Sequence, residues 1–135
     1  MTDKNESLID KNPPHPFPKP LGHYSHFVSK GGIWFIAGQI GINPKTGALE
    51  EGFKPQAKRI MDNIELILNE NNVGLNSILK TTVYLTDIST LSEFNDIYAE
   101  KLGSVCPARS AVEVKSLPNG ALVEVEMCGF MCQGA

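Results

Sequence analysis

The sequence has 135 residues, of which 41% are hydrophobic and 20% are charged, and its formal net charge is −3 at pH 7. This length suits one domain, and the composition excludes disordered, collagen-like and coiled-coil classes. A protein built mainly to hold nucleic acid normally carries a basic face, so the acidic balance argues against that class. The sequence contains no apolar stretch long enough to span a membrane and no N-terminal apolar signal core, so we expect a cytoplasmic protein.

The cysteines and histidines show no pattern typical of a metal site. Cys106, Cys128 and Cys132 are an odd count without a CxxC spacing, which fits reduced thiols better than a disulfide framework. All three histidines lie within the first 26 residues, and we expect them on the surface. The sequence also has no phosphate-binding, dinucleotide-binding or zinc-protease motif. We therefore expect neither a metal nor a cofactor.

The chain opens with a proline-rich segment and then turns into β-structure. Residues 1–20 end in PPHPFPKP and predict an extended lead-in, so the single domain is expected to be 21–135. Two β-rich runs, 24–28 and 33–37, flank a glycine turn and predict a hairpin. The second run is apolar on both of its faces.

The middle of the chain alternates helix and strand. Apolar residues spaced three and four apart follow Pro55 as far as Leu68, which predicts an amphipathic helix that ends before Gly74. Residues 78–85 are rich in Thr, Val and Tyr and predict a strand. A second amphipathic pattern runs through 91–102 and must end before a proline at 107.

Two final strands are expected at 109–114 and 122–127. The Asn119-Gly120 pair between them is a strong hairpin signal. A two-residue turn there would place Glu113 opposite Glu126 and Lys115 opposite Glu124, and a longer loop would change this register.

The predicted element order is ββαβαββ, an α+β domain in which two helices cover one face of a mixed sheet. Because strand 33–37 is apolar on both sides, two helices on one face do not account for all of its apolar surface. We therefore expect a homo-oligomer that packs sheet faces together.

Arg109 is the candidate functional residue that the pattern itself singles out. It shares one face of its strand with Ala111 and Glu113, and the surrounding apolar residues indicate partial burial. A buried guanidinium requires a carboxylate or an anionic ligand. The alternative is a solvated strand face with ordinary cross-strand charge pairs.

Four segments, taken in order, resemble the RidA family (reactive intermediate deaminase A, also called the YjgF or L-PSP family). They are LGHY at 21–24, AGQIGINPKTG at 37–47, FNDIY at 94–98, and CPARSAVEV through VEVEM at 106–127. The resemblance implies a chorismate-mutase-like fold assembled as a homotrimer, with ligand clefts between neighbouring subunits. It also implies a hydrolase that deaminates reactive 2-imino acids and their enamine tautomers, such as 2-iminobutanoate and 2-iminopropanoate, to 2-keto acids and ammonia.

The resemblance assigns roles to six residues. Arg109 would grip the substrate carboxylate and Glu124 would position the attacking water. Tyr24 and Asn95 would line the cleft, while Gly38 and Ala111 would contact the ligand through their backbones. Tyr98 lies one turn after Asn95 on the expected helix, a spacing that suits core packing, so we leave Tyr98 out of the site.

Two departures from the family pattern keep other functions open. Ala37 replaces a usual serine, and Ala111 stands where a cysteine is often found, so a nucleophilic cysteine is excluded there. One alternative is a keto-acid-binding regulatory trimer without turnover. Another is the ribonuclease or translation-inhibitor activity attributed to some family members, against which the acidic charge and the lack of a paired histidine count.

Overall fold

The observed order of elements is the ββαβαββ order that the sequence predicts. The computed structural model describes residues 19–132, so the expected lead-in at 1–20 lies, except for its last two residues, outside the described residues. The elements are β1 (Phe27–Lys30), β2 (Ile33–Gln39), α2 (Phe53–Glu70), β3 (Ile78–Leu85), α3 (Leu91–Leu102), β4 (Ala108–Glu113) and β5 (Val123–Phe130), with single 3-10 turns at Leu75–Ser77, Ile88–Thr90 and Pro118–Gly120.

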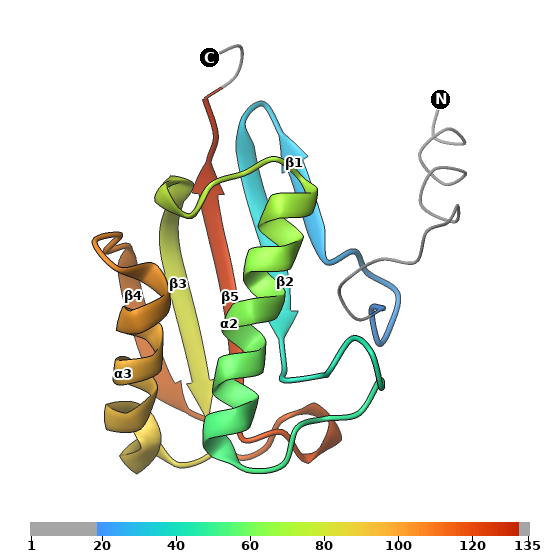
Figure 1. The fold of residues 1–135 in the computed structure, drawn as a ribbon, viewed down its shortest axis with the longest axis vertical. Helices are drawn as coiled ribbons and strands as arrows, with labels where there is room; N and C mark the ends of the chain where they lie inside the picture. The colour runs from blue at the N-terminus through green and yellow to red at the C-terminus, as the bar shows by residue number, and fades with distance from the viewer. Residues whose placement is uncertain (1–18, 133–135) are drawn as a thin grey trace.

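The strands form one mixed sheet in the order β1-β2-β5-β3-β4. Strands β3 and β4 are parallel, while the β1/β2, β2/β5 and β3/β5 pairs are antiparallel. Both helices lie in front of the sheet in Figure 1, so they cover the same face. The predicted α+β class, with two helices on one face of a mixed sheet, is confirmed.

The predicted hairpin between the last two strands is wrong. Strand β4 pairs only with β3, at the edge of the sheet, and β5 inserts between β2 and β3. Asn119 and Gly120 do adopt the positive φ angles of 60° and 71° that their sequence favours. Their turn belongs to a longer connection that passes the end of β3, where the Thr86 N–H donates to the Leu122 carbonyl at 3.2 Å. The short loop needed for direct pairing is therefore absent.

The side-chain register expected from that hairpin is wrong for the same reason. Glu126 stands opposite Thr82, and Glu124 stands opposite Tyr84. The Glu113 carboxylate instead accepts a hydrogen bond from the Ile88 N–H at 2.8 Å, across the loop that leads into α3.

The core lies between the helices and the sheet. Alternation along β5 buries Val123, Val125 and Met127 beneath the helices and turns the intervening residues to the opposite face. Trp34 of β2 is completely buried, while its neighbour Phe35 is 54% exposed. Burying a large apolar side chain contributes roughly 1.5–3 kcal/mol, so the residues beneath the helices stabilise the chain, while Phe35 stays half exposed on the open face.

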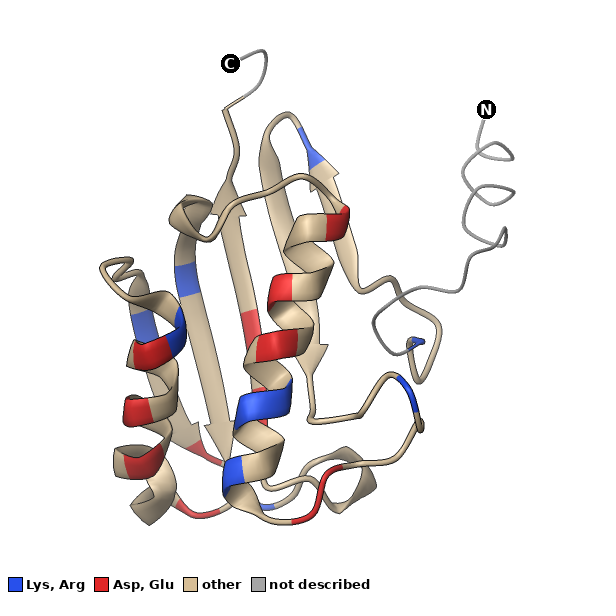
Figure 2. Cartoon of the chain, in the orientation of Figure 1, with Lys and Arg blue, Asp and Glu red and all other residues tan. Residues whose placement is uncertain are grey.

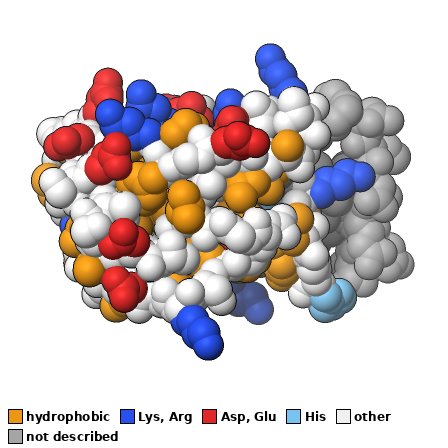
Figure 3. Space-filling model, turned by 90° about the horizontal axis from the view of Figure 1, so that it is seen from below, with side chains coloured by type: hydrophobic (Ala, Val, Ile, Leu, Met, Phe, Trp, Pro, Cys, Tyr) orange, Lys and Arg blue, Asp and Glu red, His pale blue; other side chains and the backbone are white. Residues whose placement is uncertain are grey.

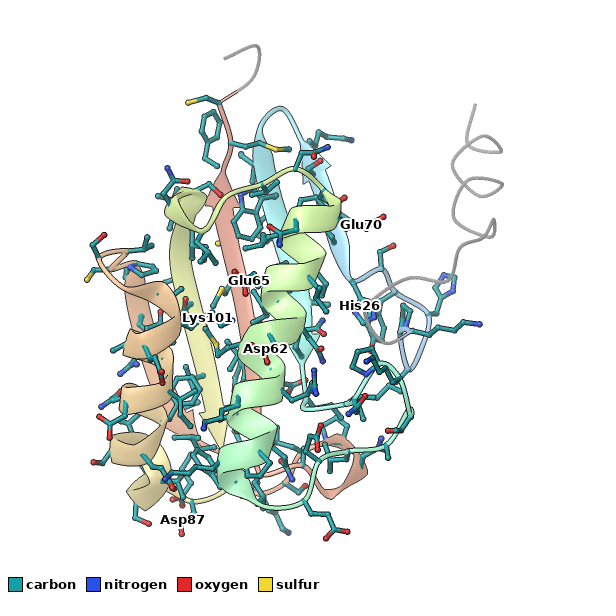
Figure 4. The ribbon with its side chains drawn as sticks, viewed as in Figure 1. His26, Asp62, Glu65, Glu70, Asp87 and Lys101 are labelled. Carbon is teal, nitrogen blue, oxygen red and sulfur yellow. The ribbon has the colours of Figure 1, made fainter. Side chains whose placement is uncertain are left out.

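A three-residue ion cluster ties the two helices together. The Lys101 ammonium of α3 lies 2.8 Å from Asp62 and 2.7 Å from Glu65, both on α2 (Figure 4). Helix α2 is amphipathic, with its apolar side on the sheet. Among residues 19–132, neither helix combines the length and apolar character required to cross a membrane.

Candidate active site

Three of the predicted site residues meet in one open pocket at the end of β2. Tyr24, Gly38 and Glu124 line a space of about 290 Å³. We call these three residues the glutamate half-site. The remaining wall is made by Lys19, Leu21, Gly22, His26, Gln39, Ile40, Ile42 and Pro118.

Gly38 and Glu124 are in direct contact. The ladder between β2 and β5 is irregular between Ile36 and Gln39, so Gly38 lies in the irregular stretch beside Glu124. A Cβ atom at Gly38 would stand 2.6 Å from Oε2 of Glu124, which is closer than atoms can approach. The glycine therefore makes room for the carboxylate, and this is the physical reason for its place in the sequence.

Glu124 is electrostatically suited to proton transfer. Burial raises the pKa of its carboxyl group, and the neighbouring carboxylate of Glu126 raises it further. The Tyr84 hydroxyl donates to Oε2 of Glu126 at 3.2 Å, and the pKa of Tyr84 is raised by burial and then by Glu126. A carboxyl group with a pKa moved toward neutrality is a better general acid or base at physiological pH.

The pocket wall also contains a buried histidine that sequence reasoning placed on the surface. His26 is only 8% exposed, and Nε2 of Gln39 lies 3.0 Å from its Nδ1. The ring of Tyr24 stands edge-on to His26, and the Tyr24 hydroxyl accepts a hydrogen bond from the Leu21 N–H at 3.0 Å. The period-two spacing of Tyr24 and His26 is the signal that could have placed both on one side.

Arg109 and Ala111 lie elsewhere, on the helix-covered side of β4. They pair in register with Thr81 and Val83 of β3, both completely buried beneath the helices. The guanidinium lies under the ring of Tyr98, with Cζ 5.0 Å from the ring centroid. Asn95 is an exposed residue of α3 and lies one turn before Tyr98. We call Asn95, Arg109 and Ala111 the arginine half-site.

The described residues supply no carboxylate partner for Arg109. Among residues 19–132, no carboxylate lies within ion-pair distance of Arg109, and no acceptor takes a hydrogen bond from its guanidinium. The solvated-strand alternative does not fit, since the side chain is half-buried against an aromatic ring. A half-buried cation of this kind is able to take up an anionic ligand.

The two half-sites lie on opposite faces of one sheet. Arg109 faces the helices, whereas Glu124 faces the open side, and β3 separates β4 from β5. A small ligand cannot touch both side chains of a single chain. Within one copy of the chain, these residues therefore form two separate half-sites.

Ala37 lies outside the pocket wall and borders a second hollow of about 320 Å³, which also includes Phe35, Glu126 and Cys128. Within residues 19–132, no group of three or more His, Cys, Asp or Glu side chains is arranged to hold a metal ion.

Comparison with known proteins extends over most of the chain. A family model described as endoribonuclease L-PSP matches residues 15–130. The RutC family protein of Aquifex aeolicus is 49% identical over 112 residues, which cover 82% of this chain and 90% of that protein. The crystal structure of RidA from an Antarctic Psychrobacter is 37% identical with a TM-score of 0.85, covering 88% of this chain and 97% of that chain. The crystal structure of E. coli TdcF with bound serine is 27% identical with a TM-score of 0.82, covering 89% and 97%.

Proposed function

Because the chain belongs to the endoribonuclease L-PSP family, also known as the RidA or YjgF family, we propose that it hydrolyses reactive 2-imino acids and their enamine tautomers. The products are 2-keto acids and ammonia, and 2-iminobutanoate and 2-iminopropanoate are the substrates we would test first. The observation that carries the proposal is the pair of half-sites. One offers a guanidinium without an ion-pair partner among residues 19–132, and the other offers a carboxyl group with a raised pKa.

The proposed enzyme is a homotrimer whose clefts join the arginine half-site of one subunit to the glutamate half-site of its neighbour. Support comes from the open sheet face, where Val28, Ile33, Phe35 and Phe130 are all about half exposed, at 53%, 50%, 54% and 47%. A contiguous apolar surface of this kind is typical of subunit interfaces. In a closed ring, one heterologous contact repeats and supplies every cleft with both halves.

In the proposed mechanism, Arg109 holds the substrate carboxylate through two parallel N–H donors. Fixing the carboxylate places the imine carbon beside one water molecule, and this positioning supplies much of the rate. Ala111 adds a backbone N–H, and the Tyr24 hydroxyl borders the same cleft. No residue forms a covalent bond to the substrate.

Glu124 carries the proton in both halves of the reaction. It accepts a proton from water as the water oxygen bonds to the imine carbon, and the C=N π electron pair moves to nitrogen, which takes that same proton from Glu124 and leaves the carboxylate ionised again. Glu124 then moves the hydroxyl proton to the amine nitrogen as the C–N bond breaks and the C=O bond forms. One water is consumed, one C=O bond forms, and ammonia leaves.

A relative with a ligand supports this choice of substrate class. The crystal structure of E. coli TdcF contains serine, a small molecule with a carboxylate next to a nitrogen-bearing carbon. A 2-imino acid has the same carboxylate and differs at the carbon that would be attacked. The same ligand also suits a regulatory trimer that binds without turnover.

The deciding experiment couples an amino-acid oxidase or threonine dehydratase to a semicarbazide trap. We expect the wild-type protein to divert the imine from the trap to the keto acid, and the Arg109→Ala variant to have no effect. If the wild-type protein binds keto acids but does not accelerate imine hydrolysis, the proposed deaminase activity is wrong and the regulatory trimer becomes the better proposal.

Ribonuclease activity is the second candidate, because the matching family model carries that description. The charges do not favour it. Acidic residues follow both helices, with Lys and Arg interspersed (Figure 2), and the end of the molecule drawn in Figure 3 shows hydrophobic side chains among charges of both signs. Nucleic-acid surfaces usually concentrate basic residues. RNA cleavage that persists in Arg109→Ala would point to another site or to a contaminant.

A further inference from the structure

Tyr98 makes contacts that core packing alone does not require. Its ring lies 5.5 Å from that of Phe94 on the same helix, as the helical spacing predicts. Its hydroxyl also donates to Oγ1 of Thr81 at 3.0 Å, and its face lies 5.0 Å from Cζ of Arg109. Three different elements, α3, β3 and β4, therefore meet at this one ring.

The orientation of the ring is determined at both ends. Phe94 is completely buried and fixes the body of the ring, while Thr81 is completely buried and accepts from the hydroxyl. Thr81 and Arg109 are also direct neighbours in the β3/β4 ladder. The ring and the base of the Arg109 side chain are thus fixed to the same pair of residues on the sheet.

We infer that Tyr98 is a positioning residue, which holds the guanidinium of Arg109 by its flat face so that its N–H donors remain available for a carboxylate. A cation over an aromatic face is attracted without any hydrogen bond. A carboxylate partner within the chain would hold the guanidinium equally well but would occupy the donors that a ligand needs. An arginine held this way is ordered before the ligand arrives, so less conformational freedom is lost on binding.

The raised pKa of Tyr98 supports the geometry. Burial raises the pKa of the phenol, against the opposing effects of Thr81 and Arg109. The ring therefore stays neutral across the physiological range and places no anion beside Arg109 that could compete with a substrate.

The test uses three full-length variants and isothermal titration with 2-ketobutanoate. Tyr98→Phe keeps the aromatic face and should weaken binding by less than about three-fold, whereas Tyr98→Leu should weaken it by roughly ten-fold or more. The matched control is Glu100→Gln, on an exposed residue of the same helix, with unchanged affinity. Thermal unfolding of each variant separates loss of binding from loss of fold.

Steady-state kinetics give a second readout that a purely structural role would not affect. The Leu variant should raise KM for the imine much more than it lowers kcat, because the reacting groups on the neighbouring half-site are intact. Equal losses in the Phe and Leu variants, or wild-type affinity in Tyr98→Leu, would overturn the inference, as would absence of keto-acid binding by the wild-type protein.

The inference rests on the role proposed for Arg109, but the two can fail separately. A wild-type protein that binds 2-ketobutanoate and does not deaminate would refute the proposed reaction. The binding series of Tyr98 variants would still decide whether the ring positions the arginine.

Discussion

The carboxylate of Glu124 occupies the space beside Gly38 that a side chain would need, since a Cβ atom there would stand 2.6 Å from Oε2 of Glu124. The contact is with the far end of a flexible side chain, so an added methyl group would displace the carboxylate and leave the backbone in place. A substitution at Gly38 should therefore change the position of the Glu124 carboxylate without changing the fold.

We expect Gly38→Ala to reduce kcat/KM by roughly 100-fold, the scale of loss caused by an ångström of misplacement in a catalytic group. Thermal stability should change little. The matched control is Gly74→Ala, where a Cβ would stand 2.8 Å from the side-chain oxygen of Asn76, away from both half-sites. Wild-type activity in Gly38→Ala would contradict the placement of Glu124 at the reaction centre.

The pH dependence should report the pair formed by Glu124 and Glu126. Glu124 acts as a base only when ionised, so kcat/KM should fall as the pH falls through its pKa. The charge of Glu126 raises that pKa. Glu126→Gln should therefore move the acidic limb of the profile to lower pH, while Glu113→Gln, on the edge strand, should leave it in place. A shift to higher pH would contradict the assignment.

Two inactive variants should restore activity to each other if each cleft takes Arg109 from one subunit and Glu124 from the next. In an equal mixture of Arg109→Ala and Glu124→Gln chains, refolded together, about a quarter of the clefts of a ring contain both wild-type residues. The coupled assay should recover a corresponding fraction of wild-type activity. Mixtures as inactive as either parent would show that the cleft is not shared in this way.

Assembly should depend on the exposed apolar face. Phe35→Glu places a charge where the proposed trimer buries an aromatic ring, and an unpaired buried charge costs several kcal/mol. Light scattering should show the mass fall from three chains to one, while the circular dichroism of the helices is retained, because residue 35 points away from the helix-covered core. Glu100→Gln serves as the control. A trimer that survives Phe35→Glu would place the interface elsewhere.

Local patterns were enough to predict most of the fold. The first hairpin, the two amphipathic helices and the alternation along β5 are each determined by neighbouring residues, through turn chemistry or hydrophobic period. The pairing of β4 was not predictable in the same way. Asn119 and Gly120 have the conformation that their sequence favours, but which strand neighbours β5 is decided by contacts with β2 and β3, far away in sequence.

The candidate site likewise has parts that local sequence predicts and parts that depend on the tertiary structure. Arg109 was recognisable because a half-buried cation is unusual, and the family resemblance proposed the remaining residues. Nothing local indicated that Arg109 and Glu124 face opposite sides of the sheet, since this depends on strand order. Tyr98 was missed as a positioning residue because its helical period also suits core packing. His26 was expected on the surface because its contact with Gln39, on β2, is a tertiary effect.

The central place of the last strand has a consequence for synthesis of the chain. During translation, the β1/β2 and β3/β4 pairs can each form early, but they share no backbone hydrogen bonds until residues 123–130 have left the ribosome. Until residues 123–130 are available, the edges of β2 and β3 that β5 will join therefore stay unpaired. A stop codon before residue 123 should yield fragments that aggregate through these unpaired edges. A ribosome that pauses before residue 123 should increase the demand of the nascent chain for chaperones.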